Sequence, residues 1–280
     1  MIITGKVGEV STIISDFQKQ GKSIGLVPTM GALHEGHLSL IDLSKKQNDV
    51  TVVSIFVNPT QFTEKHDFIT YPRTIEKDIS LLEQKNCHLL FAPSTGEMYP
   101  YKDKRAFDLN GLDAVMEGLS RPGHFNGVAQ IVTKLFDLLQ PDRAYFGEKD
   151  FQQLVIIRYL TRLMNFPVEI IPCPIIRESD GLAMSSRNRL LTPDQRILAA
   201  VIPQVMTEAR NMWPSYSVRE VKEHVAARMN AIREIKLDYF EIVEPDHLRT
   251  VTQWSQAVNP VGCIAVRIGN VRLIDNIKFS

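Results

Sequence analysis

The chain has 280 residues, which suits one large domain or a medium domain with a smaller one, and its 32 Lys and Arg balance its 32 Asp and Glu. A zero formal charge excludes a general attraction to nucleic acid or to an anionic membrane, and no stretch is long and apolar enough to cross a bilayer. The start shows no signal-peptide pattern, and the dispersed cysteines Cys87, Cys173 and Cys263 form no CxxC pair, so we expect reduced thiols and a cytoplasmic protein.

Short β-branched runs alternate with helical periodicity over the first two-thirds of the chain. The expected strands are 24–27, 50–57, 87–92, 143–146 and 168–172, and the expected helices are 35–46, 74–84, 126–139 and 151–164. Thr74 is suited to cap the second of these helices. Strands that alternate with helices predict an α/β fold with a doubly wound, Rossmann-like parallel sheet. Such a sheet binds ligands at the carboxyl ends of its strands.

The pattern changes after about residue 190. Thr192-Pro193 is a typical helix start, with Thr at the cap and Pro in the first turn. Two charged amphipathic helices are expected over 193–212 and 217–233, followed by strands near 237–243, 263–268 and 271–279. A helix pair followed by antiparallel strands predicts a smaller α+β C-terminal domain. We expect domains at 1–180 and 181–280, with the boundary between about 176 and 190.

The segment from Thr29 to His37, TMGALHEGH, follows an expected strand and opens an expected helix. His34 and His37 share one face of a helical turn, and Gly36 lets a ligand approach the backbone. A helix N-terminus favours phosphate, so two imidazoles there can neutralise a reacting phosphate or donate a proton. Two plain surface histidines are the alternative. A zinc site is disfavoured, because metalloprotease histidines are spaced i and i+4 and no third ligand is evident.

Two further segments follow expected strands. Asn58-Pro59 precedes Gln61, whose amide can orient hydroxyl and carboxylate groups, although Asn-Pro is also a common turn signal. In the second segment, Lys149 can contact a phosphate as a point charge. Asp150 can meet a ribose hydroxyl, a magnesium-bound water or the helix N-terminus, and Gln153 lies one turn further on. The alternative is a charged loop with Asp150 as a helix cap.

The segment 177–188, RESDGLAMSSRN, lies at the expected domain boundary. The hydroxyls of Ser185 and Ser186, with Arg187, make a flexible phosphate clamp that can close over a nucleotide. Taken alone, the same segment would be interpreted as a solvated linker. The chain has neither a GxxxxGK[ST] nor a GxGxxG motif, which argues against a P-loop kinase and a standard dinucleotide dehydrogenase.

The HxGH string and the later Met-Ser-Ser-Arg resemble the nucleotidyl-transfer signatures of class I aminoacyl-tRNA synthetases and their relatives. Longer strings resemble the pantothenate synthetase family, and they lie at 28–37, 56–62, 71–73, 121–125, 146–150 and 181–188. Six strings in one order are far more specific than any one of them, and the resemblance runs from about residue 20 to 200. Ser179 stands where the family pattern has Pro, which removes no functional group.

The resemblance implies a homodimeric ligase that uses ATP and Mg²⁺ to join pantoate to β-alanine through a pantoyl adenylate, with no nucleic-acid or membrane partner. It implies that His37, His34 and Lys149 are catalytic. It also implies that Gln61 and Gln153 bind pantoate, with Gln61 near β-alanine. The implied ATP contacts are Met30, Gly31, Ala32, Leu33, His34, Glu35, Gly36, His37, Gly147, Glu148, Lys149, Asp150, Ile176, Met184, Ser185, Ser186 and Arg187. Arg121 and His124 belong to a family string without an assigned role, and the metal ligands are unassigned.

Two other functions stay open at this point. A nucleotidyltransferase of the same superfamily would adenylylate a phosphate instead of a carboxylate, and it would not need Gln61 and Gln153. A nucleotide-binding regulatory module would lack His37 or the Lys149 region, and both are present. A tRNA-charging enzyme is a poor fit to this length and net charge.

Overall fold

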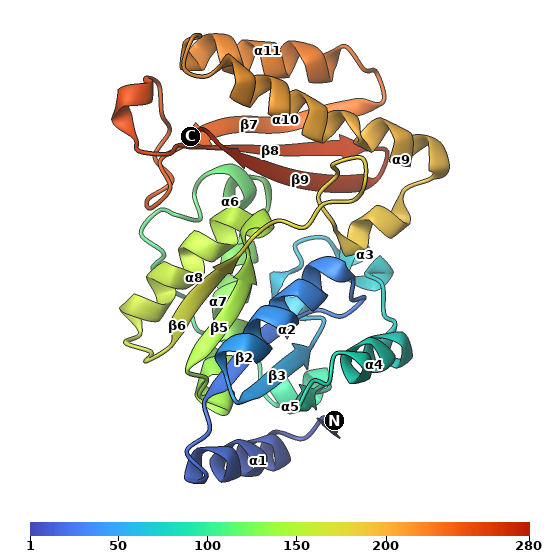
Figure 1. Ribbon diagram of the computed structural model, residues 1–280, viewed down its shortest axis with the longest axis vertical. Coiled ribbons are helices and arrows are strands. Elements are labelled where there is room, and N and C mark those ends of the chain that lie inside the picture. Colours follow the sequence, from blue (N-terminus) through green and yellow to red (C-terminus); the bar gives the residue numbers. More distant parts are fainter.

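The computed structural model describes all residues from 1 to 280 and contains two β-sheets (Figure 1). The strands of the larger sheet are β1 (Ile2–Thr4), β2 (Ile24–Thr29), β3 (Val50–Ile55), β4 (Leu89–Phe91), β5 (Arg143–Gly147) and β6 (Glu169–Cys173). They are all parallel, in the order β1-β4-β3-β2-β5-β6. The chain runs outward from β2 to β4 and then returns to β5 beside β2. This reversal is the doubly wound topology expected from the sequence.

Helices cover both faces of this sheet. Successive strand residues point to opposite sides, and the apolar ones on each side pack against helices. Leu26 of β2 packs into the larger core cluster, with residues of α1 (Val7–Lys19), α7 (His124–Leu139) and α8 (Phe151–Leu163). Its neighbour Val27 packs into another cluster, with residues of α2 (Glu35–Gln47) and α4 (Ile75–Gln84). Three short helices, α3 (Lys65–Thr70), α5 (Thr95–Met98) and α6 (Met116–Ser120), lie in the connections. None of the helices is long and apolar enough to cross a membrane.

The C-terminal part forms a three-stranded antiparallel sheet of β7 (Ile235–Val243), β8 (Val261–Ile268) and β9 (Val271–Lys278). The helices α10 (Val201–Met212) and α11 (Val218–Asn230) pack on it and form a separate apolar cluster with it. Figure 1 shows this unit lying across one end of the molecule, beyond the parallel sheet. The expected smaller α+β unit is therefore confirmed.

Most expected elements are present with bounds shifted by a few residues, but the helix expected over 193–212 was wrong. It divides at Ala200 into α9 (Pro193–Ala199) and α10. Pro203 explains the break, because it has no N–H to donate to the carbonyl of Ala199. The start of α9 is as expected, since Thr192 and Gln195 form a capping box around Pro193.

The sequence did not reveal β1, α1 or the short helices α3, α5 and α6, and two expected caps behave differently. Thr74 precedes α4, but its hydroxyl donates to the Asp78 carboxylate at 3.2 Å instead of capping the helix. Asp150 precedes α8, also without a side-chain cap. All three cysteines are buried and free, and burial raises the pKa of Cys87 to about 11 and that of Cys173 to about 12.

Candidate active site

A cavity of about 230 Å³ opens at the carboxyl ends of β2, β3 and β5. The strand order reverses between β2 and β5, which is where doubly wound sheets bind their ligands. The segments following several different strands therefore meet here. The residues of the expected site that line this cavity are Met30, His34, Gly36, His37, Gln61, Gly147, Lys149, Asp150, Gln153, Ile176, Met184, Ser185, Ser186 and Arg187.

Five residues of the expected ATP set lie outside the cavity lining, namely Gly31, Ala32, Leu33, Glu35 and Glu148. Ala32 and Leu33 are fully buried, and their N–H groups donate to the carboxylate of Asp78 at 2.9 and 2.8 Å. Gly31 and Ala32 have positive φ angles of 81° and 51°. Asp78 thus stabilises a strained turn that aims the following histidines. No sequence signal marked Asp78, because it sits among ordinary charges of an amphipathic helix.

The two histidines of the HxGH string form the N-terminal cap of α2. His34 is the cap residue, and its Nδ1 accepts a hydrogen bond from the N–H of Gly36 at 3.2 Å. The Nδ1 of His37 accepts from the N–H of His34 at 3.4 Å. Because each Nδ1 is an acceptor, the proton of each neutral ring lies on Nε2. Both Nε2–H groups are therefore free to donate to a ligand.

Gly36 is required by the position of the His34 ring. A Cβ at residue 36 would lie 2.9 Å from two atoms of that ring and 3.7 Å from the Cβ of Met184. Any side chain here would displace the imidazole from its capping position. The glycine of the HxGH string is thus required by the packing of the His34 ring, and it also lets a ligand approach the backbone closely.

Both histidines are neutral near pH 7. Burial, with the nearby charges of Lys149 and Arg189, lowers the pKa of His34 to about 4. Burial, followed by the neighbouring His34 and Lys149, also lowers the pKa of His37 well below its usual range. A neutral ring that donates through Nε2–H fits stabilisation of phosphate charge better than release of a stored proton. The two imidazoles are hydrogen-bond donors in this site.

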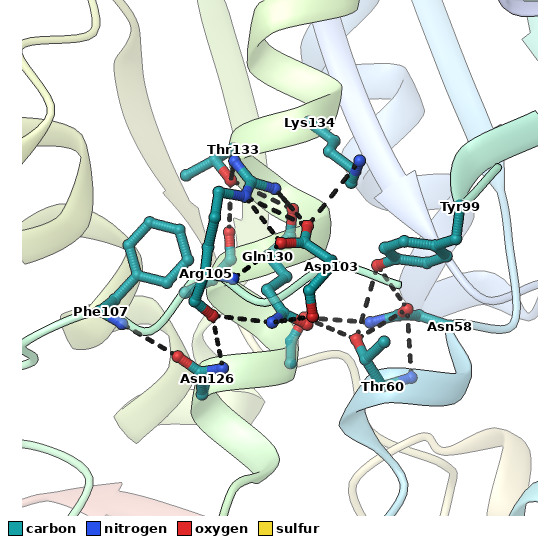
Figure 2. Close-up of polar contacts among 12 residues, drawn as sticks. Asn58, Thr60, Tyr99, Asp103, Arg105, Phe107, Asn126, Gln130, Thr133 and Lys134 are labelled. Atoms are coloured by element: carbon teal, nitrogen blue, oxygen red, sulfur yellow. Dashed lines mark hydrogen bonds and ion pairs between the residues drawn. The ribbon is translucent and has the colours of Figure 1, made fainter. Parts of the chain in front are cut away.

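Gln61 is held by a chain of hydrogen bonds that fixes which atoms of its amide face the cavity. Tyr99 donates its hydroxyl to Oδ1 of Asn58 at 2.8 Å, and Nδ2 of Asn58 donates to Oε1 of Gln61 at 3.0 Å. Figure 2 shows Tyr99 and Asn58 facing each other beside α7. With Oε1 occupied, Gln61 presents its Nε2–H₂ group, which lies 3.2 Å from the sulfur of Met30. Gln61 therefore offers a donor to an oxygen-rich ligand.

Arg121 and His124 had no role from the sequence, and the structure gives them one. Nδ1 of His124 lies 2.7 Å from the backbone carbonyl of Gln61, and its Nε2 lies 3.2 Å from Nη1 of Arg121. Burial, followed by the charge of Arg121, lowers the pKa of His124 to about 3. The neutral ring thus donates through Nδ1–H to Gln61 and accepts from Arg121. His124 fixes the backbone of Gln61, just as Asn58 fixes its side chain.

The segment expected to act as a clamp is docked against the HxGH turn. Ser186 donates to the carbonyl of Ala32 at 3.1 Å, and Arg189 donates to the carbonyl of Leu33 at 2.8 Å. Arg187 forms an ion pair with Asp67 of α3 at 2.9 Å. The solvated-linker interpretation is therefore wrong for this segment. Asp67 and Arg189 were not identified from the sequence, since their partners are distant in the chain.

The structure offers no group of three or more His, Cys, Asp or Glu side chains placed to hold a metal ion. Among the residues that line the cavity, Asp150 is the one carboxylate, and it lies 3.7 Å from Nζ of Lys149. This arrangement fits Mg²⁺, which is commonly held by one or two carboxylates together with substrate phosphates. It does not fit a structural zinc site.

A doubly wound sheet with a histidine-capped helix at its switch point, and a Ser-Ser-Arg segment docked against that helix start, defines an enzyme class that transfers a nucleotidyl group. The model of the family described as pantoate-beta-alanine ligase matches residues 2–278. The chain belongs to this family. It is 51% identical to pantothenate synthetase of Bacteroides fragilis (strain YCH46), over 100% of this chain and 99% of the relative. Its identity to pantothenate synthetase of Caldicellulosiruptor bescii is 45%, over 99% and 98%.

Solved structures agree with this assignment. Pantothenate synthetase from Thermus thermophilus superposes with a TM-score of 0.92 at 40% identity, covering 100% of this chain and 99% of that one. Pantoate-beta-alanine ligase from Francisella tularensis, solved with beta-gamma ATP and beta-alanine, gives 0.81 at 35% identity, covering 100% and 98%. The resemblance found in the motifs is thus confirmed over the whole chain.

Proposed function

We propose that this cavity carries out both half-reactions by which the chain, an ATP-dependent pantoate–β-alanine ligase, forms its amide bond. The observation that carries the proposal is the convergence of one set of donors on a single cavity at the switch point. His34, His37, Gln61, Lys149 and Arg187 come from four segments that lie far apart in the sequence. All of them offer N–H donors, and the ligands to be held are rich in anionic oxygen.

In the first half-reaction, a carboxylate oxygen of pantoate attacks the α-phosphorus of ATP. The bond from that phosphorus to the bridging oxygen breaks, and pyrophosphate leaves with the electron pair. Negative charge builds on the phosphate oxygens, and donors fixed before the reaction stabilise it at little reorganisation cost. We assign this role to the Nε2–H groups of His37 and His34 and to the ammonium of Lys149.

The placement of pantoate follows from the cavity donors that are not assigned to the phosphates of ATP. Nε2–H₂ of Gln61 is held toward the cavity by Asn58, so it suits a hydroxyl or carboxylate oxygen of pantoate. Gln153 lines the same cavity from the first turn of α8. Two neutral amides orient a carboxylate without pairing its charge, which leaves its oxygen free to attack. We therefore assign pantoate to Gln61 and Gln153.

In the second half-reaction, the amine of β-alanine attacks the acyl carbon of the pantoyl adenylate. The acyl C–O bond breaks, AMP leaves with the electron pair, and the amine loses its proton. The adenylate must be shielded from water until the amine arrives. Met184, Ser185, Ser186 and Arg187 form one wall of the cavity and suit that shielding. Gln61 suits contact with β-alanine as well as with pantoate.

Mg²⁺ enters this proposal with ATP. When bound, it supplies positive charge that neutralises the polyphosphate. Asp150 is the cavity carboxylate suited to contact the ion or its water shell. The remaining ligands would be phosphate oxygens and water, in keeping with the absence of a cluster of metal-binding side chains.

The experiment that tests this function supplies ATP, Mg²⁺ and pantoate, and follows pyrophosphate and AMP with and without β-alanine. We expect pyrophosphate to form stoichiometrically with the enzyme from pantoate and ATP alone. AMP and pantothenate should form catalytically once β-alanine is added. Turnover with a phosphorylated substrate and none with pantoate would favour the nucleotidyltransferase. ATP binding without pyrophosphate release under any condition would favour the regulatory module.

Three further properties belong to this proposal. The domain boundary lies near residues 180 and 181, supported by the packing of Leu182 in the C-terminal apolar cluster. The enzyme works in the cytoplasm, supported by its three buried free thiols. It acts as a homodimer, as the family resemblance implies, and light scattering should then give a mass of about twice 31.8 kDa.

A further inference from the structure

The loop that carries Lys149 is held by a residue from the other sheet. Asn276 lies in β9, is 4% exposed, and directs its amide at the start of α8. Its Nδ2 donates to the backbone carbonyl of Glu148 at 2.8 Å and to that of Lys149 at 3.0 Å. Lys278 of the same strand pairs with the Glu148 carboxylate at 2.8 Å. The backbone under Lys149 is thus tied to the C-terminal sheet.

The neighbour of Asn276 holds a second wall of the cavity. The Asp275 carboxylate is 3% exposed and accepts both ends of the Arg177 guanidinium, at 2.7 and 3.0 Å. Arg177 in turn donates to the carbonyl of Gly181 at 2.9 Å and forms a β-bridge with Ala183. This tight hairpin leads directly into the clamp residues 184–187. The position of the clamp therefore depends on Asp275.

The two contacts are connected through the backbone of Asn276, whose carbonyl also accepts from Nη2 of Arg177 at 3.4 Å. The N–H of Asn276 donates to Oδ1 of Asp275 at 2.7 Å, so the two side chains are oriented together. Neither residue lines the candidate active-site cavity, but both line an adjoining cavity of about 290 Å³ that shares Lys149, Ser185 and Arg187 with it. The side chains of both residues are already engaged by the two site segments, which favours an indirect effect on ATP through those segments.

We propose that Asp275 and Asn276 are positioning residues. They hold the Lys149 loop and the clamp residues 184–187 at the separation that the phosphates of ATP require. The C-terminal sheet then sets the spacing between two walls of the site that lie in different segments of the chain. The proposal rests on the phosphate-binding role assigned to Lys149. An asparagine amide is suited to this task because its two N–H groups reach two successive carbonyls at once.

A double-mutant cycle of Asn276→Ala and Lys149→Ala tests the proposal, since residues that act as a unit have non-additive effects. Asn276→Ala should raise the KM for ATP about tenfold, the scale of losing two hydrogen bonds. The KM for β-alanine should stay within about twofold, because no hydrogen bond of Asn276 leads to that substrate's assigned contact. In the Lys149→Ala background, Asn276→Ala should have almost no further effect on the KM for ATP.

Asn230→Ala is the matched control, since Asn230 is an exposed asparagine in the same C-terminal part. Asn276→Leu keeps a similar volume without the donors, so it repeats the test if the alanine variant does not fold. Equal losses for ATP and β-alanine, or full additivity with Lys149→Ala, would overturn the proposal. A Lys149→Ala enzyme with an unchanged KM for ATP would instead overturn the role assigned to Lys149. The two failures are therefore distinguishable.

Discussion

The imidazole of His37 accepts a hydrogen bond from the backbone N–H of His34, and the two ring centroids lie 4.0 Å apart. This contact converts an N-terminal helix cap into a pair of oriented donors. It satisfies a backbone N–H that would otherwise lack a partner, and it fixes the proton of His37 on Nε2. A structural role and the proposed catalytic role thus share one side chain.

Replacing His37 should separate these two roles. His37→Asn keeps an acceptor near the position of Nδ1 and removes the Nε2–H donor. We expect the rate of pyrophosphate formation from ATP and pantoate to fall about 10²–10³-fold, the cost of losing one transition-state donor. The thermal midpoint should change little. Single-turnover pyrophosphate release measures the rate, and a well-folded variant with full activity would remove His37 from the mechanism.

The ion pair between Asp67 and Arg187 should compete with ATP for the guanidinium. Asp67→Asn removes the competing charge and leaves Arg187 in place, so ATP should bind up to about fivefold more tightly, as expected for a partly exposed pair. Calorimetric titration with a non-hydrolysable ATP analogue measures this change. In an Arg187→Ala background the Asp67 substitution should have no effect. Weaker binding in the single variant would mean that the pair supports the closed clamp.

Asp78→Asn should destabilise the turn that precedes the histidines. The carboxylate accepts from the N–H groups of Ala32 and Leu33, and an amide nitrogen would face at least one of these donors. We expect the free energy of unfolding to fall by about 1–3 kcal/mol, the cost of leaving a buried group unsatisfied. Urea denaturation measures it. The exposed Asp113→Asn is the control, and an equal effect of both substitutions would contradict this role.

The buried His124 should make the protein less stable as the pH falls. Its pKa is about 3 in the folded state and near 6.5 in the unfolded chain, so only the unfolded state gains the proton between these values. This contribution is constant above pH 6.5 and favours unfolding below it. Between pH 7.5 and 5 it amounts to about 2 kcal/mol.

His124→Asn keeps a donor near the position of Nδ1 and cannot titrate. Its free energy of unfolding should therefore fall less between pH 7.5 and 5 than that of the unsubstituted protein. Some loss should remain in the variant, because His34 and His37 titrate in the same direction. Urea denaturation at the two pH values measures the difference. Equal losses in both proteins would show that His124 is protonated in the folded state.

The sequence by itself determined the parallel sheet, the longer helices α2, α4, α7 and α8 that cover it, and the family. Hydrophobic periodicity is local, and the HxGH and Ser-Ser-Arg strings can be recognised from the order of their residues alone. Local signals also placed the cap at Thr192, because a capping box involves residues only three apart. They failed at β1, a three-residue edge strand with two exposed isoleucines and therefore little periodicity to detect.

The tertiary structure alone decided how the site is oriented. Asp78, His124 and Asn276 each hold a site segment that is distant in the chain, and Asn58 bonds both the nearby Gln61 and the distant carbonyl of Gly127. In the sequence they are an ordinary helix charge, a turn residue, an unassigned histidine and a strand asparagine. Their function depends on which groups lie within hydrogen-bond distance. Helix packing on the parallel sheet sets those distances for Asp78 and His124, and the packing of the two sheets sets them for Asn276.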